Sequence, residues 1–121
     1  MKSSPPPWRL PVDKALGYLG LAARAGRLTV GTEDCVKESR RRIGGLIVAA
    51  SDAGESALRQ AAFLAGQGRG RAFRCGYTKQ ELGRAAGRAG PVALAIIWDE
   101  GLAKAFEAAA IKDRGRQEER V

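Results

Sequence analysis

Histidine is missing from this chain of 121 residues, and cysteine and aromatic residues are scarce. Without histidine, the chain lacks the commonest general base, the serine–histidine and cysteine–histidine nucleophile pairs, and imidazole metal ligands. The two cysteines, Cys35 and Cys75, lie far apart and have no Cys or His partner at metal-ligand spacing. We therefore expect reduced thiols, no metal site, no cofactor, no catalytic residues and no enzymatic activity.

Long hydrophobic runs are also lacking. The longest fully apolar run, residues 46–50, is far shorter than the roughly 20 residues needed to cross a bilayer. The proline-rich start, residues 1–8, has no apolar core of the kind found in secretion signals. These features predict a cytoplasmic protein without a membrane partner, and we expect it to be a monomer.

Acidic residues are outnumbered by basic ones. Lysine and arginine number 21 against 13 aspartate and glutamate residues, which gives a formal net charge of +8. An excess of positive charge of this size indicates the kind of partner rather than the fold. It favours a polyanion such as a nucleic acid as the partner.

The chain has the pattern of one α/β domain, residues 12–110, between a disordered proline-rich tail at 1–11 and a frayed charged tail at 111–121. Two strands are apolar on both faces and predict a central sheet covered by helices on each side. The fold class is a three-layer α/β/α sandwich with a mixed sheet of about four strands. Helices are expected at 13–25, 33–42, 56–67, 78–86 and from 100 onward; strands are expected at 28–30, 45–50, 71–75 (an edge strand) and 92–98.

Several residues are expected to serve packing or turns rather than chemistry. Cys35 is predicted to be a packed, inert thiol, and Gly17 and Gly20 indicate close approach of another element to the first helix. Ser51 and Asp52 are expected to form a turn and cap between a strand and the next helix. The larger aromatic residues are expected to pack in the core rather than to stack on bases: Trp8, Phe63, Phe73, Trp98 and Phe106.

The most informative segment is 28–42, where a short strand breaks at Gly31 and a helix follows. Thr32 is predicted to cap that helix, and Lys37, Arg40 and Arg41 are spaced to share one of its faces. The pattern alone favours a capped, solvated helix, which needs no RNA; the alternative is a helix whose N-terminus contacts a nucleic acid.

In this order of elements, the chain resembles the kink-turn-binding ribosomal protein superfamily, which includes archaeal and eukaryotic large-subunit ribosomal proteins. Its small bacterial members, the YlxQ-like RNA-binding proteins, are the most similar. The matching pieces stand in the family's order over about residues 13–110: residues 19–27, 31–37, 48–53, 78–83 and 92–97. The resemblance implies the α/β/α sandwich and the binding of structured RNA.

The resemblance also implies a set of RNA-binding residues. Classical members of the family open the second helix with the motif Gly-x-Asn-Glu-x-x-Lys. In this chain Gly31, Asp34 and Lys37 are compatible with the motif, whereas Glu33 stands in place of the Asn. A loop before the last strand covers a flipped-out base in the family, and residues 88–92 correspond to it. The implied RNA-binding residues are Gly31, Thr32, Glu33, Asp34, Lys37, Arg40, Arg41, Arg84, Arg88, Ala89 and Pro91.

Two functions remain open at this point. The first is a non-enzymatic, ribosome- or translation-associated protein that docks on kink-turn-like or internally looped RNA. The second is a protein-interaction module that keeps the same fold but has lost the recognition of bases. Glu33 permits this alternative, because a carboxylate accepts hydrogen bonds but cannot donate them as Asn does. Such a module would dock on ribosomal or transcription machinery with only nonspecific RNA contact.

Overall fold

The structure is a computed structural model; it describes residues 13–119 of the chain and the side chains of residues 14–112. Five helices alternate with four strands in this part. In chain order they are α1 (Asp13–Arg24), β1 (Leu28–Val30), α2 (Thr32–Ser39), β2 (Leu46–Ala49), α3 (Glu55–Gly66), β3 (Arg71–Arg74), α4 (Lys79–Ala85), β4 (Leu94–Ile97) and α5 (Glu100–Glu119).

The four strands form one mixed sheet in the order β1-β4-β2-β3. β4 runs antiparallel to both of its neighbours, with Ala95 paired to Val30 of β1 and to Val48 of β2. β3 lies parallel to β2 at the edge of the sheet. The predicted mixed sheet, with the two apolar strands at its centre and 71–75 at its edge, is therefore confirmed.

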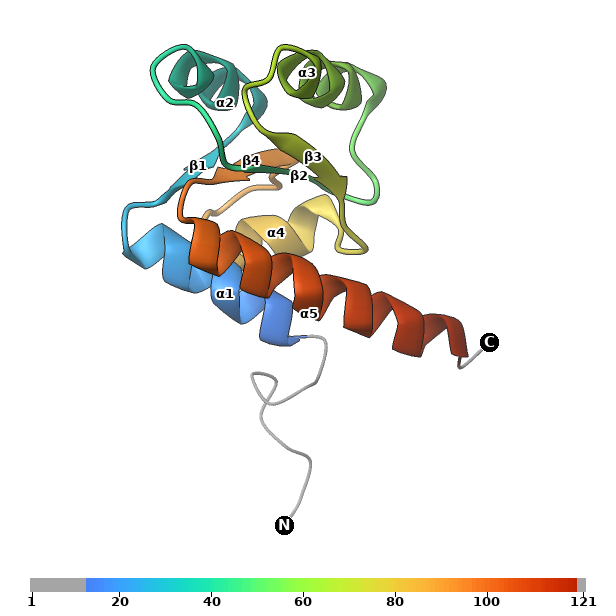
Figure 1. Cartoon of the computed structure of the whole chain (residues 1–121). Coiled ribbons are helices and arrows are strands. Elements are labelled where there is room, and N and C mark those ends of the chain that lie inside the picture. The colour runs from blue at the N-terminus through green and yellow to red at the C-terminus, as the bar shows by residue number, and fades with distance from the viewer. Residues whose placement is uncertain (1–12, 120–121) are drawn as a thin grey trace.

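Helices cover both faces of the sheet: α2 and α3 lie on one side, and α1, α4 and α5 on the other (Figure 1). Side chains of β2 and β4 alternate between two cores, as the pleat of a strand requires. On the α2–α3 side, Ile47 and Ile96 pack with Cys35 and Leu64. On the other side, the buried cluster contains Leu19, Leu46, Val48, Leu82, Ile97 and Phe106. The three-layer α/β/α sandwich is the architecture expected from the sequence.

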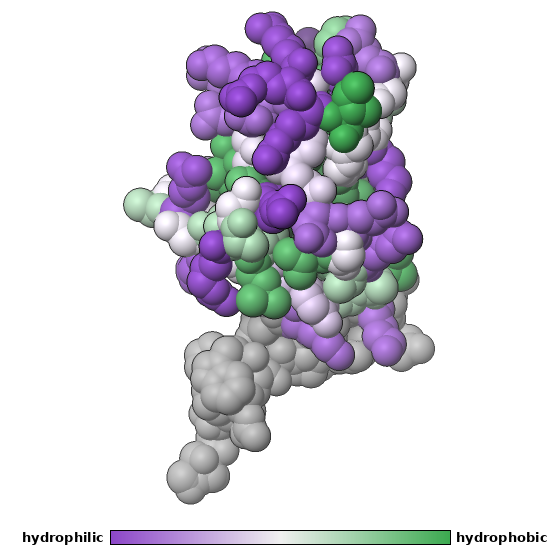
Figure 2. Space-filling view, turned by 60° about the vertical axis from the view of Figure 1, so that its left-hand side comes forward, coloured by the Kyte–Doolittle hydropathy of each residue, from purple (hydrophilic) through white to green (hydrophobic). Residues whose placement is uncertain are grey.

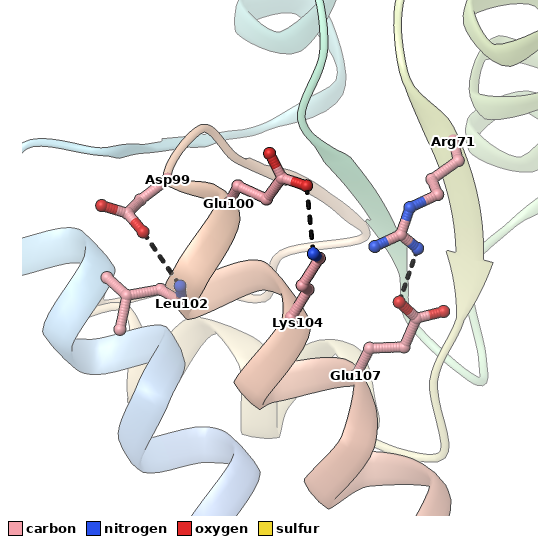
Figure 3. A network of polar contacts seen from close by, with 6 residues as sticks. All are labelled: Arg71, Asp99, Glu100, Leu102, Lys104 and Glu107. Atoms are coloured by element: carbon pink, nitrogen blue, oxygen red, sulfur yellow. Dashed lines mark hydrogen bonds and ion pairs between the residues drawn. The ribbon is translucent and has the colours of Figure 1, made fainter.

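Polar contacts cap α5 at its start and join it to the edge of the sheet farther along (Figure 3). The Oδ1 atom of Asp99 accepts a hydrogen bond of 2.9 Å from the backbone N–H of Leu102, which caps the helix. Farther along α5, Glu107 pairs with Arg71 of the edge strand β3. The helix continues to Glu119, past residue 110 at which the sequence places the end of the domain. The proline-rich residues 1–11 lie outside the described residues.

Packing explains one of the two glycines in α1. A Cβ on Gly20 would lie 3.2 Å from the carbonyl oxygen of Ala85, because α4 approaches α1 there, whereas a Cβ on Gly17 would meet nothing within 4 Å. Among the aromatic residues, Phe106 is fully buried against Phe73 and Tyr77. Phe63 on α3 is 56% exposed, so its predicted core role is wrong: the helix turns it away from the sheet, which Ala61 and Leu64 face.

No helix among the described residues combines the length and the hydropathy that a membrane span requires.

Candidate nucleic-acid interface

The sheet topology brings four chain segments to one edge of the sheet. The C-terminal ends of β1, β2 and β3 and the N-terminal end of β4 meet there, because β4 is the one strand that runs the other way. Helices α2, α3 and α4 each follow one of these strand ends. We call this the helix-start edge; it comprises residues 31–34, 51–53, 78–79 and 88–93.

Backbone hydrogen bonds join these segments directly. The N–H of Gly31 donates to the carbonyl of Leu94 at 2.9 Å, and the N–H of Ala50 donates to that of Ala93 at 3.0 Å. The N–H of Ser51 donates to the carbonyl of Tyr77 at 2.8 Å. The two segments singled out by the sequence, at 31–34 and 88–92, are therefore neighbours in space.

Gly31, rather than Thr32, is the N-cap of α2. Gly31 has φ 96° and ψ 138°, a conformation that L side chains rarely adopt, and Thr32 is already the first helical residue. No side chain makes a capping hydrogen bond to this helix start. The predicted cap at Thr32 is thus wrong, and the first N–H groups of α2 have no side-chain cap.

Two buried residues one helical turn apart orient α2. The Cys35 thiol lies within hydrogen-bonding distance of the carbonyls of Thr29 (3.6 Å) and Leu94 (3.7 Å), and the Ser39 hydroxyl donates to the carbonyl of Cys35 at 2.8 Å. Because this side of α2 faces the sheet, Glu33, Asp34 and Lys37 are exposed to solvent. The structure therefore presents all three motif side chains at the surface, starting from the helix-start edge.

Cys35 is the inert thiol that the sequence predicts. Burial raises the pKa of the Cys35 thiol to about 12, and the neighbouring charge of Asp34 adds to the rise. Burial also raises the pKa of Cys75. A thiolate is the reactive form of cysteine, so both thiols are poor nucleophiles at neutral pH.

The loop at 88–92 is held against α4 at both ends. The N–H of Arg88 donates to the carbonyl of Gly83 at 2.8 Å, and the N–H of Val92 donates to that of Lys79 at 2.9 Å. Val92 is buried and anchors the loop, while the four predicted contact residues of α4 and this loop are exposed: Arg84, Arg88, Ala89 and Pro91.

α4 starts with a capping box. The backbone N–H of Glu81 donates to the Thr78 hydroxyl at 3.2 Å, and the Glu81 carboxylate accepts from the N–H of Thr78 at 2.8 Å. Asp52 adds a second acceptor, at 2.8 Å from the N–H of Lys79. Asp52 is thus a turn residue that supports α4, and not the cap of α3, whose N-cap is Gly54.

Arg74 and Lys79 lie at this edge and were not predicted as site residues. The Arg74 guanidinium donates to the carbonyl of Ser51 at 2.9 Å, which fixes its position beside the turn after β2. The alternation in residues 71–75 predicted a half-exposed strand. It could not show that Arg74 lies at the same edge as Gly31, because that depends on the order of the strands in the sheet.

The spacing predicted that Arg40 and Arg41 share a helical face with Lys37. The structure does not bear this out. α2 ends at Ser39, Arg40 is its C-cap, and Arg41 lies in the following turn with an exposed ion pair of 3.4 Å to Glu38. The helix ends early because the chain must turn into β2 through Gly44 and Gly45, both at positive φ. Both arginines are therefore at the opposite end of α2 from Gly31.

The described residues show no cluster of three or more His, Cys, Asp or Glu side chains able to hold a metal ion. The helix-start edge instead combines exposed cations, exposed carboxylates and free helix N–H groups. Such a set suits hydrogen bonding to base edges and phosphates.

Comparison with known proteins assigns the chain to a family. The model of the ribosomal protein L7Ae/L30e/S12e/Gadd45 family matches residues 13–107, and the chain belongs to this family. A solved structure described as a protein with unknown function from Bacillus halodurans C is 31% identical, with a TM-score of 0.70 over 80% of this chain and 96% of that one.

A second solved structure is the Giardia lamblia 15.5kD RNA binding protein. It is 22% identical and has a TM-score of 0.60, over 82% of this chain and 83% of that one, so it supports the fold. The comparison with curated proteins gives no match.

Proposed function

We propose that this protein binds structured RNA at the helix-start edge and has no enzymatic activity. The observation that carries the proposal is that both motif segments lie at the same edge of the sheet: Gly31 at the start of α2 is hydrogen-bonded to Leu94, two residues after the loop at 88–92. Membership of a ribosomal protein family and the fold shared with an RNA binding protein support it.

Each part of the edge has a distinct role in the proposal. Gly31 lets RNA approach the helix start closely, since a side chain is absent there, and Thr32 contacts phosphate. Glu33 and Asp34 accept hydrogen bonds from guanine amino and imino groups, while Lys37, Arg84 and Arg88 contact the RNA backbone. Ala89 and Pro91 contact an extruded base. Arg40 and Arg41, at the far end of α2, belong to a different surface.

The preferred target in this proposal is an RNA with a kink-turn or an internal loop, because such RNAs expose base edges that a regular duplex hides. The proposal includes association with the ribosome or the translation machinery in the cytoplasm, which membership of a ribosomal protein family supports. The alternative is a protein-interaction module with only nonspecific RNA contact, and Glu33 and Asp34 favour it because they place two carboxylates where RNA phosphates would come close.

A competition experiment separates the two functions. A labelled kink-turn RNA is bound by the full chain and challenged with excess unlabelled kink-turn RNA or with a plain duplex of equal length, at two salt concentrations. Structural recognition predicts that the kink-turn competes at least tenfold better than the duplex at both salt concentrations. Equal displacement by both RNAs would rule out structural recognition and leave binding by charge alone.

A further inference from the structure

Six of the eleven arginines whose side chains the structure describes lie at the opposite edge of the sheet. The N-terminal ends of β1, β2 and β3 and the C-terminal end of β4 meet there. We call it the arginine edge and define it by the arginines that flank those strand ends: Arg27, Arg40, Arg41, Arg42, Arg69 and Arg71. The strands have up to four residues, so roughly 13 Å of sheet separates the two edges.

Contacts within the arginine edge hold its segments together. The Arg42 guanidinium lies 5.0 Å from the centre of the Trp98 ring, and the N–H of Trp98 donates to the carbonyl of Arg27 at 2.8 Å. The N–H of Gly44 donates to the carbonyl of Arg69 at 3.1 Å, which joins the loop after α2 to the loop before β3.

The carboxylates of this edge are already engaged. Glu38 pairs with Arg41, Glu107 pairs with Arg71, and Glu100 pairs with Lys104. Asp99 accepts the capping hydrogen bond of α5, as Figure 3 shows. Within the part of the chain that the structure describes, four arginines of the edge therefore have no ion pair: Arg27, Arg40, Arg42 and Arg69.

Charge is distributed differently at the helix-start edge, where Glu33, Asp34 and Asp52 offset much of the basic charge. The family motif therefore marks an edge of mixed charge, whereas uncompensated positive charge gathers at the other. Figure 2, which brings the β1 side of the molecule forward, shows hydrophilic side chains massed at the top, where α2 and α3 lie in Figure 1.

The arginine edge is also hollowed. A groove of about 400 Å³ is lined by residues 43–46 before and in β2, by Gly70 and Arg71 before and in β3, by Trp98, and by Glu100 and Ala103 of α5. Gly44, Gly45 and Gly70 put backbone rather than side chains along it. A sugar-phosphate backbone could therefore come close to the protein beside Arg71, whose planar, permanently charged donors suit phosphate.

From these observations we infer that the arginine edge is a second RNA-binding surface, which holds the sugar-phosphate backbone independently of sequence and structure. This inference extends the proposed function and rests on it for the identity of the polyanion. The helix-start edge then selects the RNA, and the arginine edge supplies most of the salt-sensitive affinity. Arg40 also interacts favourably with the C-terminal end of α2, and Arg42 packs over the Trp98 ring, but neither role accounts for the side chains of Arg27 and Arg69.

The test removes charge from one edge at a time in the full chain. The variant R40Q/R42Q/R69Q loses three positive charges from the arginine edge. The control K14Q/R59Q/K112Q loses three from exposed positions on α1, α3 and α5 outside both edges. Affinity for a kink-turn RNA and for a plain duplex of equal length is measured by fluorescence anisotropy over a series of salt concentrations.

The arginine-edge variant is expected to bind both RNAs at least tenfold more weakly at low salt. The slope of log affinity against log salt concentration should fall in magnitude by about two to three, because each lost phosphate contact removes about 0.9 from the slope. Its preference for the kink-turn over the duplex should match that of the unmodified protein. The control should keep the original slope.

Other outcomes overturn the inference. Equal losses in both triple variants would mean that only net charge matters, and unchanged binding would remove this edge from RNA contact. A loss of binding to phosphatidylserine vesicles without a loss on RNA would assign the edge to lipid. If the unmodified protein shows no kink-turn preference while the slope still falls, the proposed function fails and the inference stands.

Two further variants keep the test decisive if folding is affected. Arg69 is half-buried, so R40Q/R42Q alone, with an expected drop in slope of about two, replaces the triple variant if thermal unfolding shows a loss of structure. The variant R40K/R42K/R69K keeps the charge and is expected to keep the slope. A fall in its slope equal to that of the glutamine variant would contradict a role for charge.

Discussion

The carbonyl oxygen of Gly90 lies against Gly83, in the space that a Cβ at residue 83 would occupy. This contact presses the loop at 88–92 onto α4 and sets its position at the helix-start edge. We expect Gly83→Ala to push the loop away, to destabilise the protein by about 1–3 kcal/mol, and to weaken kink-turn RNA binding. Urea unfolding and RNA titration of the same sample would check both effects.

The matched control for this substitution is Gly17→Ala. Gly17 also lies inside a helix, but a Cβ there would meet nothing within 4 Å. Alanine is favoured over glycine in a helix interior, so the variant should be more stable by up to about 1 kcal/mol, with RNA binding unchanged. If both substitutions have the same effect on stability, helix propensity rather than the contact with Gly90 explains the result.

Lys37 provides the test of backbone contact on the exposed side of α2. Lys37→Ala is expected to weaken RNA binding and to lower the salt slope by about one, because one phosphate contact is lost for every RNA alike. Lys14→Ala on α1 is the control; it removes an exposed cation from outside both edges. Unchanged affinity and slope in the Lys37 variant would place that residue outside the interface.

Glu33 holds the position at which members of the RNA-binding family carry Asn. An amide both donates and accepts hydrogen bonds. Replacing the Glu33 carboxylate with an amide also removes a negative charge from the surface that we propose lies beside the RNA phosphates. We expect Glu33→Asn to strengthen kink-turn binding by more than it strengthens duplex binding, by roughly one bidentate contact, or 1–3 kcal/mol. Glu55→Gln, in the first turn of α3, removes one charge without adding a motif residue and should affect both RNAs equally.

Periodicity predicted the layers of this fold well because the two central strands are apolar on both faces and alternate between two cores. Periodicity could not predict the register or the order of the strands. Lys37 and Arg40 have helical spacing in the sequence, but spacing does not reveal that α2 stops at Ser39 so that Gly44 and Gly45 can turn the chain into β2.

The site shows the same limit. The motif residues of α2 and the loop at 88–92 were identified through resemblance, and local pattern alone does not distinguish them from a solvated helix and an ordinary turn. Their adjacency depends on the antiparallel pairing of β1 with β4. The grouping of Arg27, Arg42 and Arg69, which lie far apart in the chain, likewise depends on strand order and has no sequence signal.

The buried thiols make stability depend on pH above neutrality. Burial raises the pKa of Cys35 to about 12 and also raises that of Cys75, whereas an unfolded cysteine titrates near 8.5. Between about pH 9 and 12 the unfolded chain therefore binds fewer thiol protons than the folded one. The stabilising contribution is complete below pH 8.5 and is lost as the pH rises, toward 12 for Cys35, by at most about 1.4 kcal/mol per pH unit for each thiol.

Urea unfolding at pH 8, 9 and 10 tests this dependence, with the variant C35A/C75A as the comparison. The double variant is less stable at pH 8, because two packed side chains are truncated, but its stability should fall less steeply with pH. In the unmodified protein, a thiol reagent should label Cys35 and Cys75 only as fast as the protein opens. Identical pH slopes in the two proteins, or labelling faster than opening, would show that the thiols are not held protonated by burial.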